Sequence, residues 1–263
     1  MAVPTYTYVQ VQIIDNHVGL VKYNRPQSGN SLLPKMLSEV VSAMKWMHNQ
    51  SEVRIIIQTG AGTLYNTGME LVNSDGMSFA RGSDFHEINR ILIQSDKILI
   101  AAVNGPAAGY GVSSLALYDL VYSVPDAYFF TPFVKWGMAA EGASSVSFPR
   151  LMGHQKAALL FLAADRITAQ EAERIGLVSK ILVKEQFLDQ VIQVASKIAQ
   201  SAPGSLRATK QLMRQPVRQD LLDANDRECD LIHQERYGYE EYQEAVKRFR
   251  IEQLEKRKLK SKI

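Results

Sequence analysis

The 263-residue sequence contains a single cysteine, Cys229, so no internal disulfide can form. It has no CxxC motif and no cluster of cysteine and histidine with metal-ligand spacing. The five histidines are scattered without i, i+4 pairing, which gives no basis for a metal ligand. These absences predict a protein of a reducing compartment that holds no metal, with Cys229 as a buried structural thiol.

Long apolar runs are also missing. No stretch approaches the roughly 18 apolar residues that a membrane-spanning helix needs, and the N-terminal segment lacks the basic and apolar regions of a secretory signal. We therefore expect neither secretion nor a membrane span. Hydrophobic residues make up 46% and charged residues 22% of the chain, which excludes disordered and fibrous classes.

Charge is nearly balanced, at a net +3, except near the C-terminus. Residues 247–263 hold eight Lys or Arg against two Glu. Such a basic segment suits nucleic acid, a membrane surface or a phosphorylated small ligand, but a solvated helix face explains it equally simply. We expect no nucleic-acid partner.

Hydrophobic patterning predicts an α/β fold. Residues 5–14 alternate as TYTYVQVQII, and turn chemistry at 15–16 separates them from VGLVKYN, which predicts an N-terminal hairpin. Three further runs predict buried, parallel strands: residues 53–59, 98–103 and 119–124. Helical spacing precedes two of them, in residues 32–49 and 84–96, so strand, helix and strand alternate as in βαβ units.

From residue 154 onwards the pattern is helical, interrupted only by the short strand VSKILV, and no further sheet is expected. Ser201 and Pro203 are helix-start signals, and residues 217–260 are long, charged and helical. We therefore divide the chain into a core domain, residues 1–200, and a C-terminal helical region, residues 201–263. The second part is interpreted as a helical cap or assembly module.

Two glycine-bearing segments follow buried strands. The first, TGAGTLYNTGMEL (59–71), fails the dinucleotide pattern G-x-G-x-x-G because Tyr65 stands where the third glycine is required. The second, NGPAAGYGVSS (104–114), opens a helix whose first N–H groups, near Gly109, are available to an anion. Glycines at such turns more often serve close packing, so each segment alone is a weak signal.

A third segment, residues 128–153, places one acid, Glu141, among small and apolar neighbours. The simple interpretation is a helix-start charge stabilised by the helix dipole. The alternative is a carboxylate in a dry pocket, whose pKa desolvation raises and which is suited to proton transfer.

Taken in order, the motifs NRPQSGNSL, YNTGMEL, NGPAAGYGVSSLALYDLVYS and TPFVKWGMAAEG make residues 5–200 resemble the crotonase, or enoyl-CoA hydratase/isomerase, superfamily. The resemblance implies the ClpP/crotonase-like ββα spiral fold with a C-terminal helical trimerisation region. It also implies an oxyanion hole for the thioester oxygen, built from one backbone N–H of each glycine segment. The matching positions are Met69, after Gly68, and Tyr110, after Gly109.

Within the superfamily, the chain is most similar to peroxisomal Δ3,Δ2-enoyl-CoA isomerases, through PF-x-x-x-G-x-x-x-EG (132–142) and KRFR near the C-terminus. The resemblance puts Glu141 on the catalytic glutamate, which moves a proton from C2 to C4 and converts 3-enoyl-CoA to 2-trans-enoyl-CoA in fatty-acid β-oxidation. The two glutamates of hydratases correspond here to Ser113 and Phe133, so a carboxylate pair for activating and delivering water is missing. No cofactor is expected beyond the coenzyme A of the substrate.

Further contacts with substrate or CoA are expected at Arg25, Gly68, Gly109, Phe133 and Arg248. For Arg25, an exposed loop arginine is the equal alternative. Residues 72–96, including Phe79 and Arg81, are expected to wall the acyl pocket. If Glu141 were not the base, Asp75 and Asp84 would be the first candidates to replace it.

Three alternatives stay open. Another crotonase reaction, such as hydration, dienoyl-CoA isomerisation or thioester hydrolysis, is the first, and a non-catalytic acyl-CoA-binding or interaction module is the second. The third concerns location: Ser261-Lys262-Ile263 resembles the peroxisomal import tripeptide, with Ile for the usual Leu, but such tripeptides also arise by chance and leave the cytoplasm as the alternative. We expect a homotrimer or hexamer, and a peroxisomal import receptor as a partner.

Overall fold

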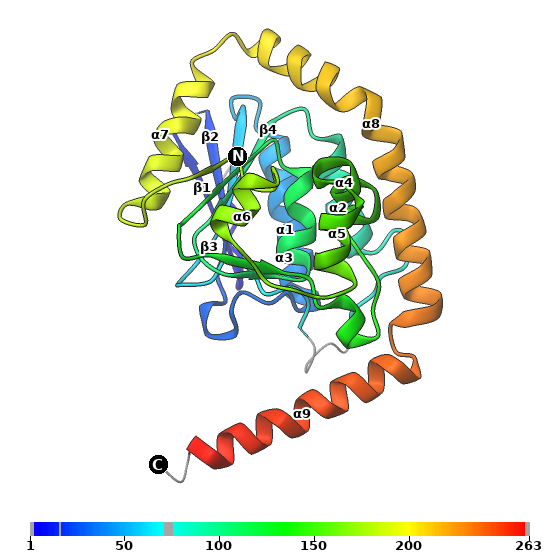
Figure 1. Ribbon diagram of the computed structural model, residues 1–263. Coiled ribbons are helices and arrows are strands. Elements are labelled where there is room, and N and C mark those ends of the chain that lie inside the picture. The colour runs from blue at the N-terminus through cyan, green and yellow to red at the C-terminus, as the bar shows by residue number, and fades with distance from the viewer. Residues whose placement is uncertain (1–2, 16, 71–75, 261–263) are drawn as a thin grey trace.

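The computed structural model describes residues 3–15, 17–70 and 76–260, and for residues 253–260 the course of the helix alone. Its strands form two sheets, one of six strands in the order β1-β2-β3-β4-β6-β9 and one of three in the order β5-β7-β8 (Figure 1). The strands are β1 Val9–Ile14, β2 Val18–Tyr23, β3 Ile55–Gly60, β4 Ile98–Val103, β5 Ala107–Ala108, β6 Leu120–Ser123, β7 Tyr128–Phe130, β8 Ile167–Thr168 and β9 Lys180–Ile181. The α-helices are α1 Pro34–His48, α2 Asp84–Gln94, α3 Tyr110–Ser113, α4 Ser144–Met152, α5 His154–Phe161, α6 Ala169–Arg174, α7 Phe187–Ala199, α8 Pro203–Leu231 and α9 Glu240–Lys260.

The larger sheet confirms the predicted class. β1 and β2 form the antiparallel hairpin, and β2, β3, β4 and β6 are parallel neighbours. All six residues of β3 are buried, as a parallel strand covered on both faces requires. β1 begins at Val9 rather than residue 5, because the N–H groups of Thr7 and Tyr8 donate to the carboxylate of Glu39 on α1 instead of to a strand.

The smaller sheet was not predicted. β8 pairs antiparallel with β7, and β7 pairs parallel with β5, so the expectation of no sheet after residue 154 besides VSKILV is wrong. Strands of two or three residues are too short for an alternating pattern to be recognised. The predicted strand VSKILV is confirmed as β9, which extends the larger sheet beside β6.

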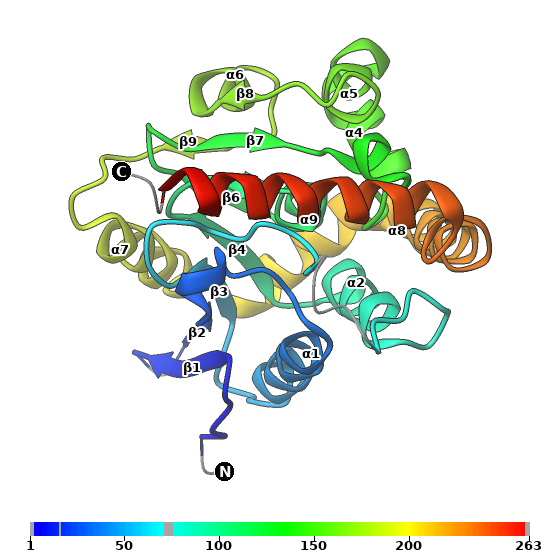
Figure 2. The same ribbon diagram turned by 90° about the horizontal axis from the view of Figure 1, so that it is seen from below.

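The C-terminal region is helical, as predicted, but it is not one continuous helix. A π-helical turn, Ile232–Arg236, ends α8, and α9 begins at Glu240. Figure 1 shows α8 along one side of the molecule, and Figure 2 shows α9 lying across its underside. Lys210 anchors α8 to the core through a partly buried ion pair with Asp119, with 2.7 Å between Nζ and Oδ2. Within the described residues, no helix combines the length and the apolar composition needed to cross a bilayer.

Candidate active site

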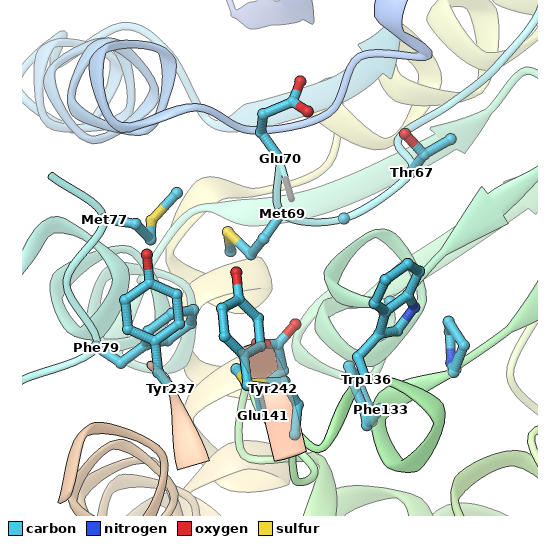
Figure 3. A pocket seen from close by; sticks show the side chains of 14 residues that line it. Thr67, Met69, Glu70, Met77, Phe79, Phe133, Trp136, Glu141, Tyr237 and Tyr242 are labelled. Carbon is cyan, nitrogen blue, oxygen red and sulfur yellow. The ribbon is translucent and has the colours of Figure 1, made fainter. Parts of the chain in front are cut away.

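A pocket forms where the two glycine-bearing segments meet the Glu141 segment and the junction between α8 and α9 (Figure 3). Methionine and aromatic side chains make most of its wall: Met69, Met77, Phe79, Trp136, Tyr237 and Tyr242. Among the described residues that line it, only Glu70 and Glu141 carry a carboxyl group, and no Lys, Arg or His is among them. An apolar cavity with few polar groups is the usual form of a small-molecule site.

The two glycine segments lie side by side because their glycines leave room for it. The N–H of Ala108 donates to the carbonyl of Asn66 at 2.9 Å. Gly68 has φ +84°, and a Cβ on it would lie 3.1 Å from the carbonyl oxygen of Ala108 and 3.3 Å from the backbone nitrogen of Tyr110. A Cβ on Gly109, with φ +52°, would lie 3.6 Å from the Cα of Gly68. Both positions therefore have a backbone conformation that favours glycine, and at Gly68 an added Cβ would also press on the neighbouring backbone.

The backbone N–H groups of Met69 and Tyr110 flank this contact. Leu32 pairs with the residues on either side of Met69: its N–H donates to Gly68 and its carbonyl accepts from Glu70. In an extended segment successive N–H groups point to opposite sides, so the Met69 N–H points away from Leu32. Tyr110 is the first residue of α3, where an N–H has no acceptor within the helix. Neither N–H donates to another group within the described residues. Their role as an oxyanion hole stays a prediction.

Glu141 is buried, with 3% of its surface exposed, and its side chain is among those that line the pocket (Figure 3). Burial, and then the charge of Glu228, raises the pKa of Glu141 to about 8. A carboxyl group that titrates near neutrality both accepts and returns a proton readily. The helix-start interpretation is wrong for Glu141, because Glu228 instead accepts the N–H groups at the start of α4, those of Ala143 and Ser145.

The other predicted contact residues divide into two groups. Gly68, Gly109 and Phe133 line the pocket. Arg25 does not: it is buried, so the exposed-loop alternative is wrong, and its Nη1 lies 2.8 Å from Oε2 of Glu70. Arg248 is exposed on α9 and is not among the residues that line the pocket. Contact of either arginine with CoA stays a prediction.

The segment 72–96 supplies part of the wall. Met77 and Phe79 line the pocket, whereas the guanidinium of Arg81 bonds to Asp226 and Asp230 on α8. Asp84 is exposed in the first turn of α2, away from the pocket. The alternative base Asp75 and the tripeptide Ser261-Lys262-Ile263 lie outside the described residues.

Three residues of the C-terminal region were missed by sequence reasoning. Tyr237 packs on Phe79 and on Tyr242, with ring centroids 5.0 Å apart in both pairs, so the pocket wall joins the segment around Phe79 to the C-terminal region. No periodic signal marks these tyrosines. For Glu228 the sequence does contain a signal. It falls on the buried stripe of α8 with Leu221 and Cys229, where a carboxylate is unusual.

The family described as enoyl-CoA hydratase/isomerase matches residues 14–262. Enoyl-CoA delta isomerase 2 of Rattus norvegicus is 34% identical over 229 residues, which cover 84% of this chain and 58% of the relative. Enoyl-CoA delta isomerase 3, peroxisomal, of Mus musculus is 31% identical over 267 residues, covering 95% of this chain and 80% of the relative. The chain thus spans less than two thirds of the rat protein.

A solved structure shares the architecture. The enoyl-CoA hydratase/isomerase from Pseudoalteromonas atlantica T6c superposes with a TM-score of 0.87 at 26% identity, covering 94% of this chain and 98% of that one. The residues that match the family, 14–262, include both glycine segments and the C-terminal helices. The chain belongs to the enoyl-CoA hydratase/isomerase family and has its crotonase fold.

Proposed function

We propose that the protein is a Δ3,Δ2-enoyl-CoA isomerase, which moves the double bond of 3-enoyl-CoA to the 2-trans position in fatty-acid β-oxidation. One observation carries the proposal: a buried carboxyl group with a pKa near neutrality, that of Glu141, shares an apolar pocket with the two closely apposed glycine segments. The names of the rat and mouse relatives support isomerase chemistry on enoyl-CoA.

The proposed reaction needs one carboxyl group and two backbone donors. The thioester carbonyl acidifies the C2–H bond, and ionised Glu141 takes that proton. The negative charge passes to the carbonyl oxygen, where the N–H groups of Met69 and Tyr110 stabilise it. Protonated Glu141 then delivers the proton to C4, which leaves the double bond between C2 and C3. Each such donor typically contributes about 10²–10³ in rate.

Hydration fits the pocket less well. The positions of the two hydratase glutamates hold the hydroxyl of Ser113 and the ring of Phe133. The second acid in the pocket, Glu70, binds Arg25 and Ser31 through Oε2, at 2.8 and 3.1 Å. That carboxylate is thus engaged in a partly buried ion pair, whereas adding water requires two carboxylates positioned to activate and deliver it.

Two substrates test the proposal. An isomerase converts 3-trans-enoyl-CoA and adds no water to 2-trans-enoyl-CoA, so product analysis of both incubations is decisive. Hydration of the 2-trans substrate or release of free CoA would overturn the assignment in favour of a hydratase or thioesterase. Binding of acyl-CoA without turnover of either substrate would identify a non-catalytic module.

We also propose a homotrimer or hexamer located in peroxisomes. Leucines are exposed on α4, on α5 and just after α5, at Leu151, Leu159 and Leu162, and contact with a second copy of the chain would cover such side chains. The peroxisomal location rests on the mouse relative's name. A monomeric mass at micromolar concentration would refute the assembly. A tagged protein that stays in the cytoplasm would refute the location and, with it, the import receptor as partner.

A further inference from the structure

Glu228 is a second buried carboxyl group beside the Glu141 segment, and it comes from α8 in the C-terminal region. It is 5% exposed. Its Oε2 accepts the N–H of Ala143 at 2.7 Å, and its Oε1 accepts the N–H of Ser145 at 2.8 Å. Both oxygens therefore hold the backbone that immediately follows Glu141, at the N-terminus of α4, where the helix dipole favours a negative charge.

The backbone held by Glu228 is strained. Glu141 is followed by Gly142 with φ +72° and by Ala143 with φ +58°. Alanine has no side-chain hydrogen bond to offset a left-handed conformation, and such residues persist where their surroundings hold them. The two hydrogen bonds to Glu228 are such a restraint. They fix the direction in which the chain leaves Glu141 and enters α4.

The same face of α8 reaches the donor side of the site. Oδ1 of Asn225 accepts from Nδ2 of Asn89 at 2.9 Å, and Oδ1 of Asn89 accepts from the hydroxyl of Tyr110 at 2.8 Å. Asn225 and Glu228 are three positions apart and so lie on one side of the helix. α8 therefore braces both the segment with the Tyr110 N–H and the segment with Glu141.

We propose that Glu228 is a positioning residue for Glu141: from α8 it holds the strained backbone after Glu141 and brings a second buried carboxyl group near the proton-transferring one. The reaction in this statement rests on the function proposed above. The hydrogen bonds of Glu228 and the burial of both carboxyl groups do not depend on that function.

Two buried carboxyl groups close to each other cannot both ionise readily. Burial raises the pKa of Glu228 to about 7, against the opposing effect of the hydrogen bonds from Ser145 and Ala143. The pKa of Glu141 is raised to about 8, through burial and the charge of Glu228. The two backbone N–H groups that donate to Glu228 favour its ionised form, and this charge raises the pKa of the Glu141 carboxyl group. Other titratable groups on the surrounding elements are Tyr110 on α3, His86 on α2, Arg150 on α4, Arg227 and Cys229 on α8, and Glu70, Tyr237 and Tyr242 in the pocket wall.

The test uses three variants of the full chain. Glu228→Gln keeps the size and removes the charge, Glu228→Asp keeps the charge and retracts it by one methylene, and Asp223→Asn removes a charge from the exposed face of the same helix. Titration of the Glu141 carboxyl group is followed by infrared spectroscopy without substrate, with the band assigned by its loss in Glu141→Gln. Isomerisation is measured as kcat and KM for 3-enoyl-CoA.

We expect Glu228→Gln to shift the Glu141 titration to lower pH and to reduce kcat roughly 10- to 100-fold, as small misplacements at a reacting centre do, with KM within about twofold of the parent. Glu228→Asp should reduce kcat while the Glu141 titration stays closer to that of the parent. Asp223→Asn should match the parent in both readouts.

An unchanged titration and kcat in Glu228→Gln would overturn the proposal, as would a loss of kcat with a parallel rise in KM and no shift in titration. If Glu228→Gln does not fold, Glu228→Asp decides, because parent-like kcat in that variant would contradict positioning. If the parent fails to isomerise 3-enoyl-CoA but Glu228→Gln still shifts the titration, the proposed reaction is wrong and the coupling of the two carboxyl groups stands.

Discussion

The two sides of the pocket, which we propose to be its donor side and its base side, are built on different principles. The donor side is backbone: Gly68 and Gly109 bring two segments into contact, and the N–H groups of the following residues flank that contact. The base side is a side chain, Glu141, whose properties depend on its burial and on Glu228 from α8. The direction of a backbone N–H group is determined by the local conformation of the chain. The pKa of Glu141, in contrast, depends in part on a residue of α8, in the C-terminal region.

The largest expected effect is on the base side. Glu141→Gln preserves the size of the side chain but cannot accept a proton, so turnover of 3-enoyl-CoA should fall by roughly 10²–10⁴ or more while acyl-CoA still binds. Glu141→Asp should retain partial activity, because it withdraws the carboxylate by one methylene. Steady-state kinetics and a direct binding assay check both. Near-parent activity in Glu141→Gln would assign the proton transfer to another group.

On the donor side, the backbone should matter and the side chain should matter less. Tyr110→Pro removes the N–H and should cost about 10²–10³ in kcat. Tyr110→Phe keeps the N–H and the ring, which packs on Phe85, and loses only the hydroxyl bonded to Asn89. We expect it to keep most of its activity. Equal losses in two variants that both fold would mean that the side chain, and not the N–H, is the important group.

The raised pKa of Glu141 on the base side should also make the stability of the protein depend on pH. Because the folded state raises the pKa of Glu141 from 4.5 to about 8, it binds a proton that the unfolded chain has already released over this pH range. Stability from this group is therefore fully present below about pH 4.5 and is lost as the pH rises through about 8. Glu141→Gln has no such proton, so its free energy of unfolding should exceed the parent's at pH 8 to 9 by on the order of a few kcal/mol.

Thermal or urea unfolding across pH checks this sign. The stability difference between Glu141→Gln and the parent should be near zero at pH 4 and grow with pH. Asp223→Asn, on the exposed face of α8, is the control and should not show this growth. A difference that is constant with pH would mean that Glu141 titrates normally in the folded protein.

The features that the sequence predicts are those that depend on local patterns. The parallel strands, the hairpin and the first helices were predicted because burial on two faces leaves continuous apolar runs, and helices leave a regular spacing. Gly68, Gly109 and Glu141 were found because each stands in a short motif. In the pocket these three residues lie together, as the order of the motifs implied.

What was missed depends on contacts between distant parts of the chain. β8 has two residues and exists because β7 lies beside it. The exposed-loop alternative for Arg25 is wrong because the side chain is buried and bonds to Ser31 and to Glu70, which lies 45 residues along the chain. Tyr237 enters the pocket wall only because the break between α8 and α9 folds back onto Phe79. No local pattern encodes such pairings, although an acid on the buried stripe of α8 was a signal for Glu228.

The smallest expected effect sharpens the donor side further, because two glycines share a backbone conformation but not a neighbourhood. Gly68 has φ +84°, and an added Cβ would press on the backbone of Ala108 and Tyr110; Gly82 has φ +80° and nothing within 4 Å of an added Cβ. Alanine at either position should cost about 1 kcal/mol of stability for the left-handed backbone. Only Gly68→Ala also displaces the Tyr110 N–H, by a few tenths of an ångström, and we expect about a tenfold loss of kcat there and parent-like kcat in Gly82→Ala. Because the conformational cost is shared, the difference in kcat between the two variants isolates the contact between the glycine segments. Equal kcat values in the two variants would show that the close approach of Gly68 to Gly109 does not set the position of the donor.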